Sequence, residues 1–298
     1  MPELPEVETM RRGVLPIVGQ RIDSAERPPC KRKPIQFEPA IRTFNARVRG
    51  KRVTAIDRLG KRVLICLEDE QTIVIEPRMT GLVLLSDPPG EEHLRLRLSL
   101  SGGDFEQLLF WDRRGLGTVR LYSADALQER VRDRLGPDAL VVADTDLMDR
   151  LGSSRRAVKV ALLDQTAVAG IGNLYAAEIL FLAGVDPRTR CDRLSKPQWR
   201  RIASATQHVL QEAIEHEGST LSDGTYRNAL NNAGGYQNYH RVYDRAEETC
   251  PRCGLGQIRR IVQAQRSTFF CPVCQRKSGL HEALKDSSFA VTGRADML

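Results

Sequence analysis

Four of the seven cysteines stand in two close pairs, and this spacing is typical of a metal site. The pairs are Cys250-x2-Cys253 and Cys271-x2-Cys274, separated by 17 residues. Each pair can hold one ion with two thiolates from a tight turn, and two pairs complete the tetrahedron that a structural zinc ion prefers. The alternative is four free cysteines. The other three are interpreted as small buried residues: Cys30, Cys66 and Cys191.

The stretch that holds the paired cysteines is strongly basic. Residues 250–277 contain six Arg or Lys and no Asp or Glu. Apolar residues between the two pairs, such as Ile258 and Phe269, predict a β-hairpin that zinc would clamp at its base. A rigid basic hairpin suits a phosphate backbone, although zinc ribbons also bind proteins.

The N-terminus offers a second kind of chemistry. Removal of Met1 would leave Pro2 with a free secondary amine, and an α-amino group titrates at about pH 8. Such an amine can attack a sugar carbon and form an iminium, with Glu3 and Glu6 beside it to move protons or hold the amine. The alternative is an ordinary helix start, where proline and acidic residues are both favourable.

The elements that would position these residues differ along the chain. Residues 3–15 predict a helix, and short apolar runs dominate the next hundred residues. Leucines alternate with polar residues from Leu94 to Leu100, which is typical of a strand with one buried face. The pattern predicts an antiparallel sandwich or barrel. The other predicted strands lie at 63–65, 72–75, 82–85 and 108–111.

The second half has helical periodicity. Residues 124–135 predict a helix, Gly136-Pro137 breaks the chain, and apolar residues recur at helical spacing over 146–218. The turn at 170–173 precedes a helix, whose N-terminal amides could receive a phosphate oxygen, or it is a plain interhelical turn. Residues 219–240 predict a loop because they are rich in Gly, Asn and Ser.

Length and charge set broader limits. The 298 residues carry 45 Lys plus Arg against 38 Asp plus Glu, a net charge of +7 that favours an anionic partner only weakly. No apolar run is long enough for a transmembrane helix, and the acidic start is unlike a secretory signal. We therefore expect a cytoplasmic protein of two domains with a small appendage.

Several motifs together resemble the formamidopyrimidine-DNA glycosylase family over about residues 1–277, in the family's own order. Leu4 favours this branch over the related endonuclease VIII type, which usually has glycine there. The matching segments are 1–9, Gly60-Lys61-Arg62, Met79-Thr80-Gly81, Asp112 to Gly117, 170–176 and Gln265 to Cys271.

The resemblance implies an α+β multidomain fold. We expect an N-terminal antiparallel β-sandwich domain that begins with a helix, then a helix–two-turn–helix domain, then a zinc-finger β-hairpin holding one structural zinc ion. The expected boundaries are 1–123 for the sandwich, 124–147 for a linking helix, 148–245 for the helical domain with a lesion-recognition loop at 219–240, 246–277 for the zinc finger and 278–298 for a loose tail.

The resemblance also implies roles for single residues. Pro2 matches the nucleophile on C1′ of the damaged nucleotide, Glu3 the acid that assists sugar-ring opening, and Glu6 a further active-site carboxylate. Lys61 matches a lysine near the reacting sugar and phosphate, and Arg266 the zinc-finger arginine that grips phosphates. The residues matched to DNA binding are Met79, Arg114 and Leu116, which fill the gap left by an extruded base, and Lys159 and Asn173 at the DNA face.

The implied function is base excision repair. The enzyme would excise oxidised purines, 8-oxoguanine and formamidopyrimidines, through a Schiff base on proline and cleave the strand by β,δ-elimination. Its partner would be double-stranded DNA with oxidised bases or abasic sites. We expect the protein to act as a monomer and not to bind a membrane. The alternatives are an endonuclease VIII-like preference for oxidised pyrimidines and a catalytically silent binder of damaged DNA.

This chain departs from the family pattern at three places. Leu116 replaces the usual phenylalanine, and Glu76-Pro77-Arg78 replace the common His-Leu-Gly, which removes a histidine phosphate contact. Arg78 could substitute for that histidine, whereas the Glu76 carboxylate would oppose DNA unless it faces away. Residues 219–240, where the family places its lesion-recognition loop, match poorly, so this segment does not indicate which damaged base is preferred.

Overall fold

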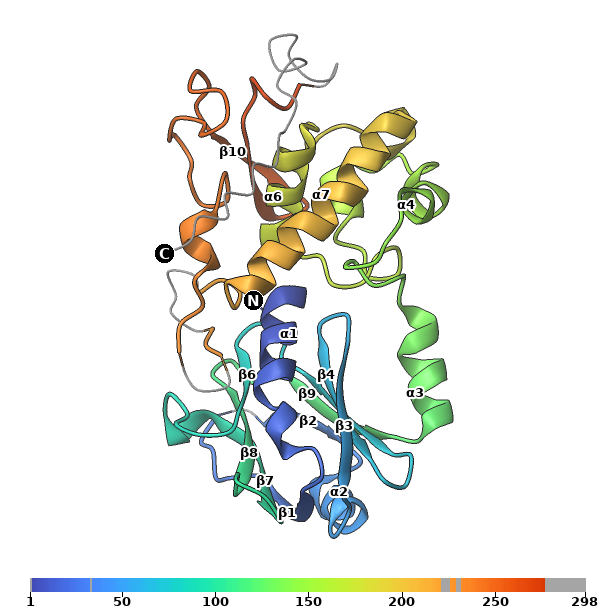
Figure 1. Ribbon diagram of the computed structural model, residues 1–298, viewed down its shortest axis with the longest axis vertical. Helices are drawn as coiled ribbons and strands as arrows, with labels where there is room; N and C mark the ends of the chain where they lie inside the picture. Colours follow the sequence, from blue (N-terminus) through green and yellow to red (C-terminus); the bar gives the residue numbers. More distant parts are fainter. Residues whose placement is uncertain (1, 33, 221–225, 229–231, 277–298) are drawn as a thin grey trace, which may run out of the picture.

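The computed structural model describes residues 2–32, 34–220, 226–228 and 232–276. It confirms the predicted α+β architecture: a β-sandwich at one end, a helical body at the other, and a zinc-binding hairpin beside the helices (Figure 1). No helix in these residues is long and apolar enough to cross a membrane. The tail at 278–298 lies outside the described residues, as do parts of the 219–240 loop.

Two sheets form the sandwich, and their facing apolar side chains make its core. One sheet has the order β1-β7-β8-β6 and the other β2-β9-β5-β4-β3. The strands are β1 (Arg21–Glu26), β2 (Gln36–Glu38), β3 (Val53–Leu59), β4 (Arg62–Leu67), β5 (Thr72–Glu76), β6 (Gly81–Leu84), β7 (Leu94–Ser101), β8 (Gln107–Asp112) and β9 (Thr118–Tyr122).

The sandwich differs from the sequence prediction in three details. Strand β2 pairs parallel to β9, and helix α2 (Ile41–Val48) interrupts a region predicted as strands only. Arg95, predicted on the polar face of its strand, is only 2% exposed. The pairing of β7 with β8 shifts its register between Leu94 and Leu96, at the position of Arg95. The buried Arg95 side chain donates to the Asp112 carbonyl.

The helical body is built around two helices that pack against each other. Helix α6 (Asn173–Ala183) is buried along nearly its whole length, and α7 (Lys196–Glu215) packs against it. The other helices are α3 (Ala124–Arg130), α4 (Asp144–Leu151) and α5 (Val158–Ala161). Short 3-10 turns lie at Leu15–Ile17, Glu91–His93, Arg132–Arg134, Cys191–Arg193 and Tyr236–Tyr239.

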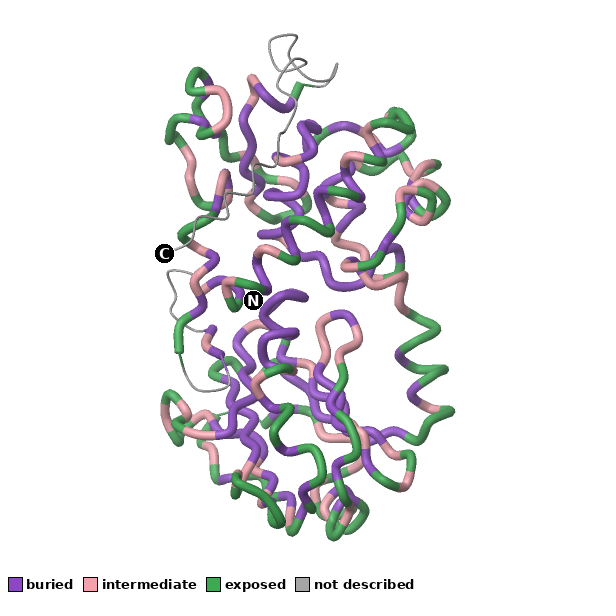
Figure 2. The backbone as a smooth tube through the Cα atoms, viewed as in Figure 1, coloured by how far each residue is buried: buried purple, intermediate pink, exposed green. Residues whose placement is uncertain are grey.

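Helix α1 (Leu4–Gly13) belongs to both bodies. Leu4 lies in the core of the helical body, whereas Val7 and Met10 lie in the core of the sandwich. Figure 2 shows this helix buried at the junction of the two bodies. A capping box between Glu3 and Glu6 begins it, with Glu3 N–H donating to the Glu6 carboxylate at 2.8 Å. The first residues of the chain are therefore fixed at the interface.

The zinc-binding hairpin docks on α6. Its strands β10 (Arg259–Gln263) and β11 (Arg266–Phe270) are joined by a two-residue turn, Ala264-Gln265, in which both residues have positive φ. The buried Glu178 of α6 accepts the backbone amides of Arg241, Val242 and Tyr243 at 2.8–2.9 Å. These three bonds attach the segment that leads into the hairpin to helix α6.

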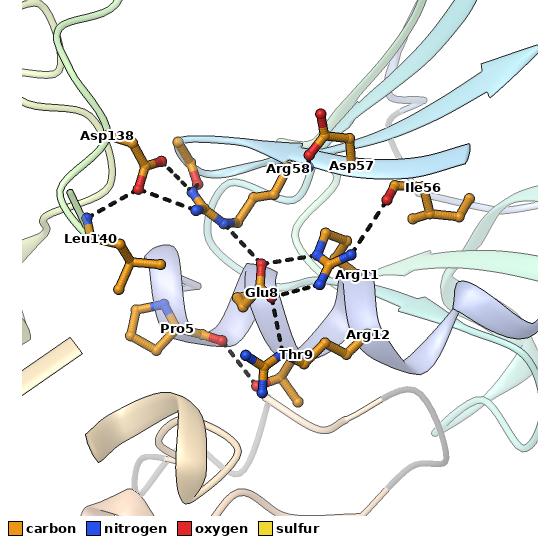
Figure 3. Close-up of polar contacts among 11 residues, drawn as sticks. Pro5, Glu8, Thr9, Arg11, Arg12, Ile56, Asp57, Arg58, Asp138 and Leu140 are labelled. Carbon is orange, nitrogen blue, oxygen red and sulfur yellow. Dashed lines mark hydrogen bonds and ion pairs between the residues drawn. The ribbon is translucent and has the colours of Figure 1, made fainter. Parts of the chain in front are cut away.

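An ionic network also joins the two bodies (Figure 3). Arg58 of β3 donates to Glu8 of α1 at 3.1 Å and to both carboxylate oxygens of Asp138, at 2.6 and 3.2 Å, in the segment that leads to the helices. Glu8 also accepts from Arg11 and Arg12. Despite its burial, hydrogen bonds from these arginines lower the pKa of Glu8.

Replacement of Arg58 by Met should lower the free energy of unfolding by about 2 kcal/mol, because it leaves Glu8 and Asp138 without their shared buried partner. Arg12→Met is the matched control, since Arg12 binds the same Glu8 from a side chain that is half exposed, and it should cost under about 1 kcal/mol. Urea denaturation of the full chain measures both. Equal losses would contradict this account of the junction.

Candidate active site and zinc centre

Pro2 lines a small, largely basic pocket between the two bodies. The pocket has a volume of about 190 Å³. Its charged walls come from the β3–β4 turn and the start of β4, from the end of β5 and the turn after it, and from the zinc hairpin. The charged residues are Lys61, Arg62, Glu76, Arg78 and Arg266. The structure thus brings the predicted nucleophile, Lys61 and Arg266 to one place, although they lie far apart in sequence.

Glu3 is held by the N-terminus of α6. Its carboxylate accepts the amide of Gly172 at 2.6 Å and that of Leu174 at 3.0 Å. The helix dipole and these two donors stabilise the negative charge of the carboxylate. These amides, which the sequence suggested as a phosphate site, therefore bind a side chain of the protein in this structure.

Glycines in the turn before α6 make this approach possible. A Cβ on Gly172 would lie 2.2 Å from the Glu3 carboxyl carbon, and one on Gly170 would lie 2.4 Å from Leu4 Cδ1. Gly170 also has φ +114°, which disfavours other residues. The glycines of this turn thus serve the packing of the N-terminal segment.

Glu6 is fully buried behind Glu3. Its carboxylate accepts the Tyr175 hydroxyl at 2.6 Å and the Ser219 amide at 2.9 Å, in addition to Glu3 N–H. Burial raises the pKa of Glu6, and the neighbouring Glu3 charge adds to this effect. Glu6 therefore connects the N-terminus, α6 and the start of the 219–240 loop, and it favours holding a proton more than an exposed glutamate does.

Lys61 reaches across the junction of the two bodies. Its ammonium donates to the carbonyl of Ile171 at 2.8 Å, directly before Gly172. Burial lowers the pKa of Lys61, and the attraction of Glu3 opposes this shift. The side chain is thereby held at the pocket wall beside Pro2.

The zinc hairpin supplies Arg266, the first residue after its turn. Asn173, the first residue of α6, donates from Nδ2 to the Ser267 carbonyl at 3.1 Å and so ties the hairpin to the helix. Arg266 is exposed at the mouth of the pocket. Its position depends on the contact between α6 and β11.

Lys159, which the sequence placed at the DNA face, is buried in this structure. Its side chain is 0% exposed and donates to Asn173 Oδ1. Burial, followed by repulsion from Arg266, lowers the pKa of Lys159 to about 8. In this structure Lys159 positions the Asn173 side chain.

The three residues predicted to fill the gap in DNA come from two neighbouring turns. Met79 lies in the turn between β5 and β6, and Arg114 and Leu116 lie in the turn between β8 and β9. Leu116 is 46% exposed, and Arg114 is also exposed. An exposed leucine on a fixed turn can serve as an apolar wedge without an aromatic ring.

Asp112 joins these two turns and was not singled out by the sequence. Its buried carboxylate accepts the Thr80 hydroxyl at 2.5 Å, the Gly117 amide at 2.8 Å and the Arg114 amide at 3.2 Å. The sequence did hold a signal for this role, because Asp112 is an acidic residue at the end of an apolar strand and directly before two arginines. Asp112 therefore positions the turn that presents Arg114 and Leu116.

The four paired cysteines form the predicted zinc site. Their sulfur atoms all lie within 4.8 Å of one another, with 3.7 Å between Cys250 and Cys274 and 3.9 Å between Cys253 and Cys271. Zinc–sulfur bonds of about 2.3 Å in a tetrahedron require sulfur–sulfur distances of about 3.8 Å. The amides of Gly256 and Cys274 point at Cys253 and Cys271, at 3.4 Å, and so stabilise thiolates. All four ligand positions are taken by protein, so the zinc is structural.

Asp112→Asn should destabilise the protein by about 2 kcal/mol, because one carboxylate oxygen becomes an NH2 group that faces hydrogen-bond donors. The exposed Asp104 provides the control, and its replacement by Asn should leave stability within about 0.5 kcal/mol of the parent. Thermal and urea unfolding report the difference. If the two variants behave alike, Asp112 does not organise the turns.

Cys271→Ser should release the zinc ion, because a hydroxyl does not replace a thiolate ligand in a site of this kind. The metal content, measured by atomic absorption, should fall from one zinc per chain towards zero. Cys191→Ser is the matched control, since Cys191 is equally buried but outside the cluster, and it should keep its zinc. Loss of zinc from both variants, or from neither, would contradict the assignment.

The chain matches three family descriptions in order. Residues 1–119 match the formamidopyrimidine-DNA glycosylase N-terminal domain, residues 135–225 its helix–two-turn–helix domain, and residues 247–276 the zinc finger found in such glycosylases and in isoleucyl-tRNA synthetases. These ranges correspond to the sandwich, the helical body and the hairpin module described above.

Individual relatives agree with these matches. A formamidopyrimidine-DNA glycosylase of Chloroflexus aurantiacus is 41% identical over 281 residues, which cover 92% of this chain and 98% of the relative. The crystal structure of the MutM (Fpg) protein of Thermus thermophilus has a TM-score of 0.80 at 38% identity and covers 92% of this chain and 98% of that one. The Lactococcus lactis Fpg in complex with abasic-site DNA has a TM-score of 0.81 at 33% identity, over 92% and 100%. This chain therefore belongs to the formamidopyrimidine-DNA glycosylase family.

Proposed function

We propose that this protein is a bifunctional DNA repair glycosylase, which excises oxidised purines and then cleaves the strand at the resulting abasic site. The observation that carries the proposal is the position of Pro2. Its nitrogen becomes a free amine when Met1 is removed, and it lies in a pocket with cationic walls and with buried carboxylates behind it. A silent DNA binder has no use for such an amine.

The first step exchanges one bond at C1′ of the damaged nucleotide for another. The unprotonated Pro2 nitrogen forms a bond to C1′, the bond from C1′ to the base breaks, and the proton that the nitrogen then loses leaves with the base. Opening of the sugar ring gives an iminium, and Glu3, next to Pro2 in the chain, is the group proposed to take a proton from solvent and pass it to the ring oxygen. The hydrogen bonds from Gly172 and Leu174 keep this carboxyl in place.

Strand cleavage follows from the iminium. The C2′ proton becomes acidic, and its removal breaks the C3′–O bond and releases the 3′ phosphate. A second elimination releases the 5′ phosphate, and water then hydrolyses the iminium and frees Pro2. Lys61 and Arg266 line the same pocket as Pro2, and we propose that they provide positive charge for the departing phosphates.

The same scaffold supplies the means to hold an extruded nucleotide. Met79, Arg114 and Leu116 stand on two joined turns, and we propose that they fill the gap in the base stack. Known relatives have been solved with abasic-site DNA and with 8-oxoguanine-containing DNA, which supports damaged duplex DNA as the partner. We propose that one chain acts alone.

Retention of Met1 should abolish covalent trapping by borohydride on a duplex with an abasic site, because the Pro2 nitrogen is then an amide. Binding of the same duplex should stay measurable, since the cationic walls of the pocket remain. Pro2→Gly should reduce trapping sharply, because it replaces the secondary amine of proline with a primary amine. The control is the parent chain with its N-terminus verified by mass spectrometry.

The duplexes used for trapping also test the substrate. The proposal predicts that 8-oxoguanine and formamidopyrimidine duplexes are trapped more efficiently than a thymine glycol duplex. The reverse order would favour oxidised pyrimidines instead. Absence of an adduct on every duplex, with Met1 shown to be removed, would leave only the silent binder.

A further inference from the structure

One carboxylate in the Pro2 pocket holds two arginines. Arg62 begins β4 and Glu76 ends the neighbouring β5, and the strand register places them side by side, one step beyond the pair Val63 and Ile75. Glu76 Oε1 lies 3.5 Å from Arg62 Nη2 and 3.4 Å from Arg78 Nη1. Both contacts use the same oxygen and are long for hydrogen bonds, so the guanidinium groups keep most of their donors.

The backbone at Arg78 is strained. Its φ is +57°, a left-handed conformation that disfavours every residue except glycine, in a turn closed by the Gly81 amide donating to the Pro77 carbonyl. A Cβ on Gly81 would lie 2.5 Å from that carbonyl oxygen, so the close approach of the chain in this turn requires glycine at position 81. A strained arginine that lines a pocket indicates a use for its side chain.

The charges of the pocket favour an anion. Lys61, Arg62, Arg78 and Arg266 line it, and Glu76 is the one carboxylate among its lining residues. Because Glu76 bridges Arg62 and Arg78, it holds the two guanidinium groups close together despite their like charge. Two adjacent guanidinium groups present planar arrays of donors that match the oxygens of a phosphodiester.

We propose that Arg62 and Arg78, held together by Glu76, form a binding site for a single phosphodiester of the DNA strand next to the nucleotide at Pro2. The carboxylate of Glu76 then serves as the bridge that fixes the site. Its negative charge is smaller than the summed positive charge of the four cationic side chains that line the pocket. This inference rests on the proposed function, because the phosphodiester belongs to the damaged strand.

The direct test uses duplexes in which one phosphate beside an abasic-site analogue is replaced by an uncharged methylphosphonate. The parent protein should lose about tenfold in affinity at one position of the scan. At that position Arg62→Gln and Arg78→Gly should show no further loss, because the contact is already absent. The control Arg47→Gln, an exposed residue of α2, should behave as the parent at every position.

The salt dependence of binding gives a second readout. Each of the two variants should reduce the slope of log affinity against log salt by about one, since one phosphate contact releases about one counterion. Arg47→Gln should leave the slope unchanged. If the variants remain as sensitive as the parent to every methylphosphonate and keep its salt slope, the two arginines only form ion pairs with Glu76 and the inference is wrong.

Arg78→Gly separates binding from a structural role. Glycine adopts φ +57° without strain, so the variant should melt at the same or a higher temperature while it binds DNA more weakly. A lower melting temperature together with an unchanged affinity would mean that Arg78 serves the turn alone.

Failure of this inference is distinguishable from failure of the proposed function. Borohydride trapping by the parent protein tests the amine and does not depend on how the scan turns out. A parent that traps an abasic site but shows no coupling with Arg62 or Arg78 overturns only the phosphate site. A parent that traps nothing overturns the enzyme proposal.

Discussion

The bonds between the Glu3 carboxylate and the N-terminus of α6 are the contact on which the rest of the site depends. They join the second residue after Met1 to a helix about 170 positions later in the chain. A carboxylate at a helix N-terminus is favourable in both charge and hydrogen bonding, so this contact needs no further partner. Pro2 is fixed because the residue after it is fixed.

Several features of the molecule serve that contact. The glycines before α6 leave room for the N-terminal segment, and Leu4 fills the space beside Gly170. Glu6 and Tyr175 hold the start of α1 from behind, while Arg58 joins α1 to the segment before the helical body. The same helix α6 carries Asn173 and Glu178, which dock the zinc hairpin. One helix thus places both the amine and the hairpin arginine.

The sequence predicted the fold class and the metal site well, because both rest on local patterns. The cysteine spacing is set by the turns that bind zinc, and strand alternation is set by a buried face. The sandwich, the helical body, the zinc site and the family are confirmed. The proposed roles of Pro2, Glu3 and Lys61 remain predictions, although the structure brings these residues together.

What the sequence could not predict are contacts between distant segments. Nothing local to Lys159 shows that its side chain is buried beneath Asn173, and nothing local to Glu3 shows that it binds the amides once suggested for phosphate. The departure at Glu76-Pro77-Arg78 predicted a lost histidine contact that Arg78 could replace, but it did not predict what the Glu76 carboxylate binds, since its partner on β4 appears only with the strand register. The partners of these three charged side chains are set by how distant segments pack in the folded chain.

The central claim is that the nucleophile is the Pro2 nitrogen, and the most direct measurement is the location of the trapped sugar on the protein. After borohydride reduction on an abasic-site duplex, nuclease and trypsin digestion would leave a remnant on one peptide. The account predicts that mass spectrometry finds this remnant on the N-terminal amine of the peptide covering residues 2–11. A remnant on Lys61 or on another lysine, with residues 2–11 unmodified, would contradict it.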